Sequence, residues 1–280
     1  MLRTTSLRVC GPADLPEVLA LLDRDPVTNV FVASRVRAGG LEPWRLGGEL
    51  WAHVVEGDIA ALCYAGANLV PVEAGPEAVR AFAERARRQG RRCSSLVGPA
   101  DQVLPLWELL APAWGPAREV RAAQPLMVCD GPPAVAPDPA VRLVRPEELD
   151  LLLPASVAMF TEEVGVSPVG ADGGTLYRAR VGELVQSRRA FARFEGGRVV
   201  FKAEVGAVTP RACQVQGVWV SPECRGQGLA APGMAAVVEL ARASLAPVVS
   251  LYVNDFNAPA RAAYRRAGFR EVGTFASVLF

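Results

Sequence analysis

Lysine and histidine are almost absent from this chain. Of its 30 basic residues only Lys202 is a lysine, and His53 is the only histidine. This inventory excludes zinc sites built on histidine pairs, and it excludes catalytic triads that need a histidine in the C-terminal half. His53 lies in the apolar stretch LWAHVVEG, where we interpret it as a structural residue of a strand and not as a catalytic one.

The chain also lacks long apolar runs, excess charge and paired cysteines. No run of about 18 apolar residues occurs, and the N-terminus has no apolar signal-peptide core, which predicts a soluble cytoplasmic protein without a membrane partner. The formal net charge of +1 provides no field that would attract nucleic acid. The six cysteines are widely spaced without a CxxC pair, so we expect reduced thiols and no metal site. The oligomeric state stays open.

A proline-rich stretch divides the 280 residues, of which 51% are hydrophobic, nearly in half. CDGPPAVAPDPAV, at positions 129–141, contains four prolines and cannot form a helix or an interior strand. We therefore predict an N-terminal domain over residues 1–128, a linker over 129–140 and a C-terminal domain over 141–280.

The two halves resemble each other in their order of elements. Each begins with a short strand, a proline turn and an amphipathic helix. A hairpin that turns at Glu-Gly follows in each half, then a helix that leads into an apolar strand, and a final helix. This order indicates an internal duplication. It is supported by residues that align at the start of each half: Arg8 with Arg142, Pro12 with Pro146, Asp14 with Glu148 and Leu15 with Leu149.

The second half contains a glycine-rich turn, CRGQGLA. A strand pattern over residues 212–220 ends at Ser221 and Pro222, and a helical pattern starts near Gly228 and runs to about Ser244. Glycines at 226 and 228 let the backbone approach a ligand closely, while the helix N-terminus and Arg225 favour negative charge. The comparable loop of the first half, LVPVEAGPEAVR, has a glutamate and no paired glycines. If one half binds a pyrophosphate, it is the second.

Two motifs in the second half resemble the GNAT family of N-acetyltransferases. Arg225, Gly228 and Ala230 match the Gln/Arg-x-x-Gly-x-Gly/Ala loop of that family. About thirty residues later, NAPARAAYRRAGF matches the N-x-x-A-x-x-x-Y-x-x-x-G-F block. The resemblance covers roughly residues 140–280, and the whole chain resembles an actinobacterial GNAT subfamily that carries an extra N-terminal domain. It implies tandem GNAT-like α/β domains, each with a mixed, mostly antiparallel sheet flanked by helices, the first of them degenerate.

The resemblance also implies a cofactor and a proton donor. Acetyl-CoA would lie in a V-shaped opening between two strands, with no metal involved. Tyr264 would protonate the departing thiolate as general acid, although it could instead be a packed aromatic residue. The implied cofactor-binding residues are Val218 and Val220 for the pantetheine, Arg225, Gly226, Gln227, Gly228, Leu229 and Ala230 for the pyrophosphate, Asn254 near the end of the second strand of the opening, and Asn257 at the start of the last helix.

The general base is less clearly indicated. Many GNAT members have a glutamate at the position of Gln214, which cannot act as a base. A hairpin turning at residues 208–210 would place Glu204 opposite Gln214 and Lys202 opposite Gln216. We therefore take Glu204 as the candidate base, acting directly or through water. The alternatives are that Glu204 only pairs with Lys202, that Glu162 or Glu163 is the base, or that there is none.

The segment MFTEEVGVSPVG, at residues 159–170, follows the first helix of the second half, where GNAT members usually line the acceptor site. Phe160, Glu162, Glu163 and Gln214 are candidate substrate contacts, or the two glutamates form a solvated helix end. The resulting hypothesis is an acetyl-CoA-dependent N-acetyltransferase that acts on a small-molecule or peptide amine. The alternatives are a non-catalytic acyl-CoA-binding regulatory module and an interaction protein.

Overall fold

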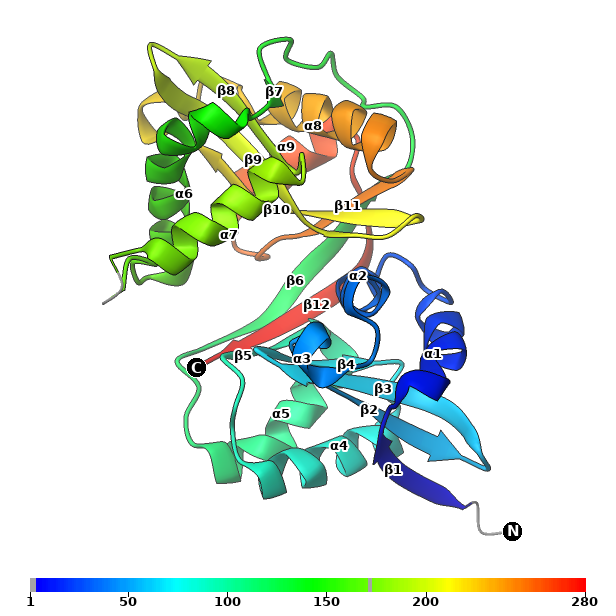
Figure 1. Ribbon diagram of the computed structural model, residues 1–280. Helices are drawn as coiled ribbons and strands as arrows, with labels where there is room; N and C mark the ends of the chain where they lie inside the picture. The colour runs from blue at the N-terminus through cyan, green and yellow to red at the C-terminus, as the bar shows by residue number, and fades with distance from the viewer. Residues whose placement is uncertain (1–3, 171–172) are drawn as a thin grey trace. The chain divides into compact units, whose positions relative to one another are not determined.

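The computed structural model describes residues 4–170 and 173–280, so the first three residues of the predicted N-terminal domain lie outside it. The chain divides into two compact units. Unit 1 contains Met1–Leu126, Tyr252–Phe256 and Glu271–Phe280, and unit 2 contains Met127–Leu251 and Asn257–Arg270. Each unit combines a mixed sheet with flanking helices, which confirms the predicted fold class (Figure 1).

Unit 1 is built on a sheet in which β1 to β5 lie in chain order, followed by β12 and β6. The antiparallel neighbours are β1–β2, β2–β3, β3–β4 and β5–β12, whereas β4 and β5 are parallel. Its strands are β1 (Thr5–Val9), β2 (Gly48–Val55), β3 (Asp58–Gly66), β4 (Asn68–Val72), β5 (Ser95–Pro99), β6 (Glu119–Cys129) and β12 (Arg270–Leu279). Its helices are η1 (Pro12–Asp14), α1 (Leu15–Leu22), α2 (Val30–Gly39), α3 (Pro43–Leu46), α4 (Pro76–Gln89) and α5 (Ala100–Trp114).

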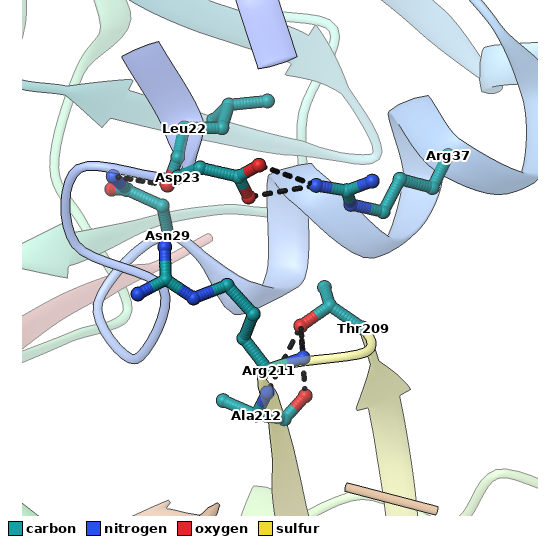
Figure 2. A network of polar contacts seen from close by, with 7 residues as sticks. All are labelled: Leu22, Asp23, Asn29, Arg37, Thr209, Arg211 and Ala212. Atoms are coloured by element: carbon teal, nitrogen blue, oxygen red, sulfur yellow. Dashed lines mark hydrogen bonds and ion pairs between the residues drawn. The ribbon is translucent and has the colours of Figure 1, made fainter. Parts of the chain in front are cut away.

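Alternating side chains of the unit 1 strands supply two apolar cores, one on each face of the sheet. Leu50 and Tyr64 pack with residues of α1 to α3, and Trp51 packs with residues of α4 and α5. Figure 1 shows these two helix groups on opposite sides of β1–β5. Exposed ion pairs tie the helices at the surface, for example Arg37 of α2 with Asp23 at 2.7 Å (Figure 2).

Unit 2 contains a sheet with the strand order β11-β10-β9-β8-β7. Helix α6 contacts β9 and β10, and α7 contacts β9, on one face of the sheet, while α8 contacts β9 on the other face and packs against α9 (Figure 1). There Gly233 leaves room for the Phe201 ring, because a Cβ would lie 2.8 Å from it. The elements are β7 (Arg142–Leu143), η2 (Pro146–Glu148), α6 (Leu149–Val164), α7 (Thr175–Gln186), β8 (Ala190–Glu195), β9 (Arg198–Val208), β10 (Ala212–Val220), η3 (Pro222–Cys224), α8 (Ala230–Ser244), β11 (Val248–Tyr252) and α9 (Ala258–Ala267).

The two predicted Glu-Gly hairpins are present. Glu56 and Gly57 turn the chain between β2 and β3 with φ values of 55° and 104°. In the second hairpin Glu195 ends β8, and the turn residues are Gly196 and Gly197, with φ values of 53° and 74°. Positive φ at both turn positions matches the twist of paired strands and favours glycine.

The β9–β10 hairpin forms as expected, but the predicted register is wrong. Its turn is Thr209–Pro210–Arg211, in which the Thr209 hydroxyl accepts from the amide of Ala212 at 3.1 Å (Figure 2). Two register shifts follow along the strands. As a result Gln216 lies opposite Glu204, Trp219 lies opposite Lys202, and Gln214 lies opposite Ala207. Periodicity shows that two strands alternate but carries no signal for an inserted residue.

The start of each unit shows the same local motif, as the aligned residues suggested. In unit 1 the Arg8 guanidinium binds both carboxylate oxygens of Asp14, which also accepts from the amide of Gly11. In unit 2 Arg142 binds both oxygens of Glu148, which accepts from the amide of Arg145. In both cases one arginine–carboxylate pair links a strand to the short 3-10 helix that precedes an α-helix.

The segment between β6 and β7, residues 130–141, contains no helix or strand, as expected for its prolines. Within residues 4–170 and 173–280, no helix is long and apolar enough to cross a membrane.

Candidate active site

The loop between β10 and α8 presents an open backbone surface in unit 2. Gly226 and Gly228 have φ values of 77° and 81°, and a Cβ at either would meet nothing within 4 Å. The glycines are therefore required by the left-handed backbone and not by crowding from this chain. Helix α8 begins at Ala230, with neither a capping side chain nor an acidic residue in its first turn. Its first amides have no intrahelical acceptor, and this end of the helix favours an anion.

The equivalent loop of unit 1 is closed by its own side chains. The amide of Ala74 donates to Gln102 Oε1 at 3.0 Å. Glu73, with φ of 50°, binds Arg24 at 3.0 Å, and Glu77 lies in the first turn of α4. One amide that could face a phosphate is thus occupied, and two carboxylates add negative charge there. The contrast with CRGQGLA follows the difference in sequence.

Arg225 links the glycine loop to the predicted acceptor segment. Its Nη2 lies 2.6 Å from Glu162 Oε2, and its Nε donates to the Val220 carbonyl at 3.1 Å. The indole of Trp219 donates to the other oxygen of Glu162 at 3.1 Å. The side chains of Arg225 and Glu162 are 49% and 45% exposed, so the pair is accessible to a competing anion.

Strands β10 and β11 are paired over a short stretch only. The parallel ladder joins Ala212–Gln214 to Val248–Ser250, whereas β10 continues to Val220. Val218 and Val220 thus lie on the part of β10 that has no ladder to β11 among the described residues. Gly217 forms a bulge with φ of 59°, where a Cβ would lie 3.0 Å from the Glu204 carboxyl carbon and from Met159. The bulge bends β10 and changes the direction of the residues that follow it.

Lys202, Glu204 and Gln216 form a buried polar network beside this bulge. Lys202 Nζ lies 3.1 Å from Glu204 Oε2 and 3.0 Å from the Gly217 carbonyl. Gln216 Nε2 donates to the remaining oxygen, Oε1, at 3.0 Å. Lys202 is 1% exposed and Glu204 7%. Of the alternatives for Glu204, the pairing with Lys202 is the one seen.

Gln214, at the position where many GNAT members have a glutamate, is 8% exposed and does not join this network. Its Nε2 is buried and has no hydrogen-bond partner among the described residues. An unpaired buried amide is unfavourable, so an acceptor from a bound molecule would stabilise this position.

Phe160, a predicted substrate contact, pairs with Tyr177, an aromatic residue that the sequence patterns did not mark. Phe160 and Tyr177 stack edge to face with centroids 5.5 Å apart, and the Tyr177 hydroxyl donates to the Ser156 carbonyl at 2.9 Å. Burial, with the charge of Glu204 nearby, raises the pKa of Tyr177 to about 12. Tyr177 lies in the first turn of α7, in the stretch TLYRAR. The apolar residues of this helix do not gather clearly on one face, and no motif marks Tyr177.

Tyr264 lies on α9 and is 7% exposed. Burial raises the pKa of Tyr264, and the negative charge of Glu163 adds to this effect. The predicted acid and one predicted substrate residue are therefore close enough to interact. Asn257 caps α9, since its Oδ1 accepts from the Ala260 amide at 3.2 Å. This cap accounts for an asparagine at the start of the helix without a ligand.

Asn254 belongs to unit 1. Its Oδ1 accepts from Gln124 Nε2 at 2.8 Å, and Gln124 Oε1 accepts from the Ser277 hydroxyl at 2.7 Å. Gln124 and Ser277 are buried. The Asn254 side chain thus has a structural partner on β6. Within the described residues, no group of three histidine, cysteine, aspartate or glutamate side chains could hold a metal ion.

Comparisons with known proteins identify the class. Residues 168–269 match the family model described as "Acetyltransferase (GNAT) family", and residues 48–152 match the "Domain of unknown function (DUF4081)". The chain therefore carries a GNAT acetyltransferase domain and an extra N-terminal domain, which confirms the resemblance seen in the sequence. The GNAT family consists of acetyltransferases, which generally use acetyl-CoA as the acetyl donor.

Solved structures share the fold over the whole chain. A GNAT-family acetyltransferase from Colwellia psychrerythraea is 13% identical, with a TM-score of 0.58 and 98% and 99% of the two chains covered. A GCN5-related N-acetyltransferase from Sphaerobacter thermophilus is 18% identical, with a TM-score of 0.60 and 98% and 95% covered. A tandem GNAT protein from the clavulanic acid biosynthesis pathway is 17% identical, with a TM-score of 0.56 and 99% and 98% covered. A search of curated proteins found no match.

Proposed function

We propose that this protein is an acetyl-CoA-dependent N-acetyltransferase whose active site lies in unit 2. In this proposal the acceptor amine attacks the thioester of acetyl-CoA directly, and the acetyl group moves to nitrogen. The observation that carries the proposal is the open, uncapped loop from Arg225 to Ala230, found within a GNAT domain that also contains Tyr264. A cytoplasmic location stays a prediction of the sequence.

The residues of the loop fit a pyrophosphate. Two glycines in the left-handed region expose the backbone, the first amides of α8 have no acceptor within the helix, and Arg225 supplies a positive charge. The backbone of Val218 and Val220 would hold the pantetheine arm as an added strand. Asn257 would act from the start of α9, where its side chain already caps the helix.

Tyr264 is suited to hold a proton at its hydroxyl until the thiolate leaves. Its raised pKa keeps the phenol neutral throughout the working pH range. The departing thiolate is the conjugate base of a group with a reference pKa near 8.5, so proton transfer from a phenol with a raised pKa is uphill. The general-acid role therefore requires that the bound cofactor and acceptor lower the pKa of Tyr264 toward its ordinary value of about 10.

Glu204 stays the candidate base from the sequence, but its contacts favour the structural alternative. Lys202 and Gln216 occupy its two oxygens, so uptake of a proton would weaken the ion pair with Lys202. Glu163, whose charge acts on both Tyr177 and Tyr264, is the other carboxylate near the aromatic side chains. A Glu204→Gln variant that keeps the wild-type pH–rate profile would exclude Glu204 as base.

The acceptor site would combine aromatic and acidic side chains. Phe160 and Tyr177 offer ring surfaces, while Glu162 and Glu163 add negative charge on α6. Such a surface suits a protonated amine on a small molecule or a peptide before it is deprotonated for attack.

A non-catalytic acyl-CoA-binding module is the second candidate, favoured by Gln214 in place of a glutamate. The two functions are separated by measuring acetyl-CoA binding and thiol release on the same preparation. Saturable binding with thiol release that depends on an added amine supports the enzyme. Binding without release across a wide amine panel supports the module, and the absence of binding contradicts both.

A further inference from the structure

A cavity lies in unit 1, away from the loop between β4 and α4. Its volume is about 280 Å³, and it sits where β2 and β4 begin and β3 ends. The C-terminal ends of α4 and α5 form its other walls, through Gln89 and Trp114. None of its residues belongs to the motifs used for acetyl transfer.

The Glu49 carboxylate lines this cavity and is held in place by hydrogen bonds. Glu49 Oε2 accepts from Trp51 Nε1 at 2.7 Å, from Arg85 Nη2 at 3.3 Å and from Gln89 Nε2 at 3.4 Å. The indole donor above all, together with Gln89 and Arg85, holds the pKa of Glu49 below its usual value. The other oxygen, Oε1, has no hydrogen bond within the described residues and can accept from a ligand.

The cavity also holds donors that lack acceptors. Trp114 Nε1 is buried and has no partner in the described part of the chain. Arg92 lines the same cavity, is exposed, and forms no ion pair with any residue that the structure describes. A buried N–H without an acceptor is unfavourable, and a guanidinium binds carboxylates well, so both groups suit an anionic oxygen of a ligand.

Two further features favour a cation beside Glu49. Helices α4 and α5 both end at the cavity, and the carbonyl end of a helix favours positive charge. Trp51 and Trp114 both line the cavity. The Trp51 ring already carries the Arg85 guanidinium, 5.0 Å from its centroid, so Trp114 is the indole that can offer a ring face to an ammonium group. Leu69, Ala65 and Ala86 add apolar side chains to the lining of the cavity.

We propose that this cavity binds a free α-amino acid with an apolar or aromatic side chain. Its ammonium group would bind Glu49, its carboxylate would bind Arg92 and the Trp114 indole N–H, and its side chain would pack on Leu69 and Ala86. The existence of this site does not depend on the proposed acetyl transfer.

The test is calorimetric titration of the full-length protein with three probes: L-phenylalanine, phenethylamine and 3-phenylpropionate. We expect L-phenylalanine to bind saturably and at least about tenfold more tightly than either probe that lacks one charged group. Glu49→Gln should weaken the binding of L-phenylalanine and of phenethylamine about tenfold and leave the binding of 3-phenylpropionate unchanged. Arg92→Gln should weaken the binding of L-phenylalanine and of 3-phenylpropionate about tenfold and leave the binding of phenethylamine unchanged.

Glu108→Gln and Arg80→Gln, both exposed in unit 1 and outside the cavity, are the matched controls and should bind like wild type. Ala65→Phe, which fills the cavity without removing a charge, should abolish binding and keep the acetyl-CoA affinity. The proposal is overturned if L-phenylalanine does not bind. It is equally overturned if binding persists unchanged in Ala65→Phe, or if neither charge variant distinguishes the probes.

Discussion

At the scale of single residues, the contacts of a side chain in the folded protein help to decide between a functional and a structural role where the sequence leaves both open. The GNAT block marks Tyr264, and its burial adds a raised pKa that keeps the phenol protonated. Glu204 was marked by an assumed strand register, and the observed contacts tie it to Lys202 instead. A motif fixes residue type and spacing, whereas the partner of a side chain depends on register and packing.

Tyr264→Phe should lower kcat roughly 100-fold or more and change acetyl-CoA affinity little, because it removes the donated proton and not the ring. Steady-state kinetics with calorimetric binding separates the two effects. Tyr64→Phe is the matched control. It removes a buried hydrogen bond to the Gly47 carbonyl at 3.0 Å and should lower the unfolding free energy by about 1 kcal/mol without changing kcat. An unchanged kcat in Tyr264→Phe would remove this residue from the acid role.

The Arg225–Glu162 pair should compete with the cofactor. Glu162→Gln frees the guanidinium and should tighten acetyl-CoA binding by less than about fivefold, since exposed ion pairs contribute about 0–1 kcal/mol. Arg225→Gln should weaken binding about tenfold. In the double variant the Glu162 change should have no effect, which a double-mutant cycle by calorimetry measures. Additive effects would show that the two side chains act independently.

At the scale of elements, the loops distinguish two similar units. Helix and strand positions follow from periodicity and from proline and glycine. The β10 strand, the α8 helix and both Glu-Gly hairpins lie close to their predicted places. Bulges at Gly217 and between Gln214 and Val215 could not be predicted, because they insert residues without changing composition. The strand that pairs with β12 could not be predicted either, since an alternating pattern of apolar residues does not indicate which strand lies next to it in the sheet.

Gly228→Ala should weaken acetyl-CoA binding more than it destabilises the fold. Its φ of 81° is unfavourable for a residue with a Cβ, at a cost of about 1 kcal/mol, and the added methyl group would stand on the open loop surface. Gly57→Ala, with φ of 104° in the β2–β3 turn, is the control for strain alone. Equal acetyl-CoA affinity in the two variants would contradict the role of this loop.

The arginine–carboxylate motif makes stability depend on acid pH. Arg142, with the Arg145 amide, lowers the pKa of Glu148 from 4.5 to about 2. Because the folded pKa is lower, this stabilisation is present above about pH 4.5 and is lost as the pH falls toward 2. Glu148→Gln should flatten that acid dependence in urea unfolding measured across this range, and the exposed neighbour Glu147→Gln should not. An unchanged dependence in Glu148→Gln would reject this motif as its source.

At the scale of the whole molecule, the two units differ at the loop between a strand and the helix that follows it. Unit 2 keeps an uncapped helix start with glycines and Arg225, while in unit 1 Gln102 occupies the Ala74 amide and glutamates flank the loop. The sequence predicted this contrast, because a glutamate and a missing glycine pair are visible without a structure. It did not reveal Gln102, which reaches the loop from another helix.

The chain should therefore bind one acetyl-CoA and not two. Calorimetric titration should give a stoichiometry of one per chain, and Arg225→Gln should lower the affinity without revealing a second site. Two sites of similar affinity would show that the closed loop of unit 1 opens for the cofactor and would contradict its interpretation as a degenerate copy.

The central claim is acetyl transfer by unit 2, and release of free CoA tests it most directly. Purified protein is incubated with acetyl-CoA and a panel of small amines and peptides, and thiol formation is followed for wild type and Tyr264→Phe. We predict amine-dependent release by wild type and a loss of roughly 100-fold or more in the variant. Binding of acetyl-CoA with no release for any acceptor, or equal release by both proteins, would contradict the account.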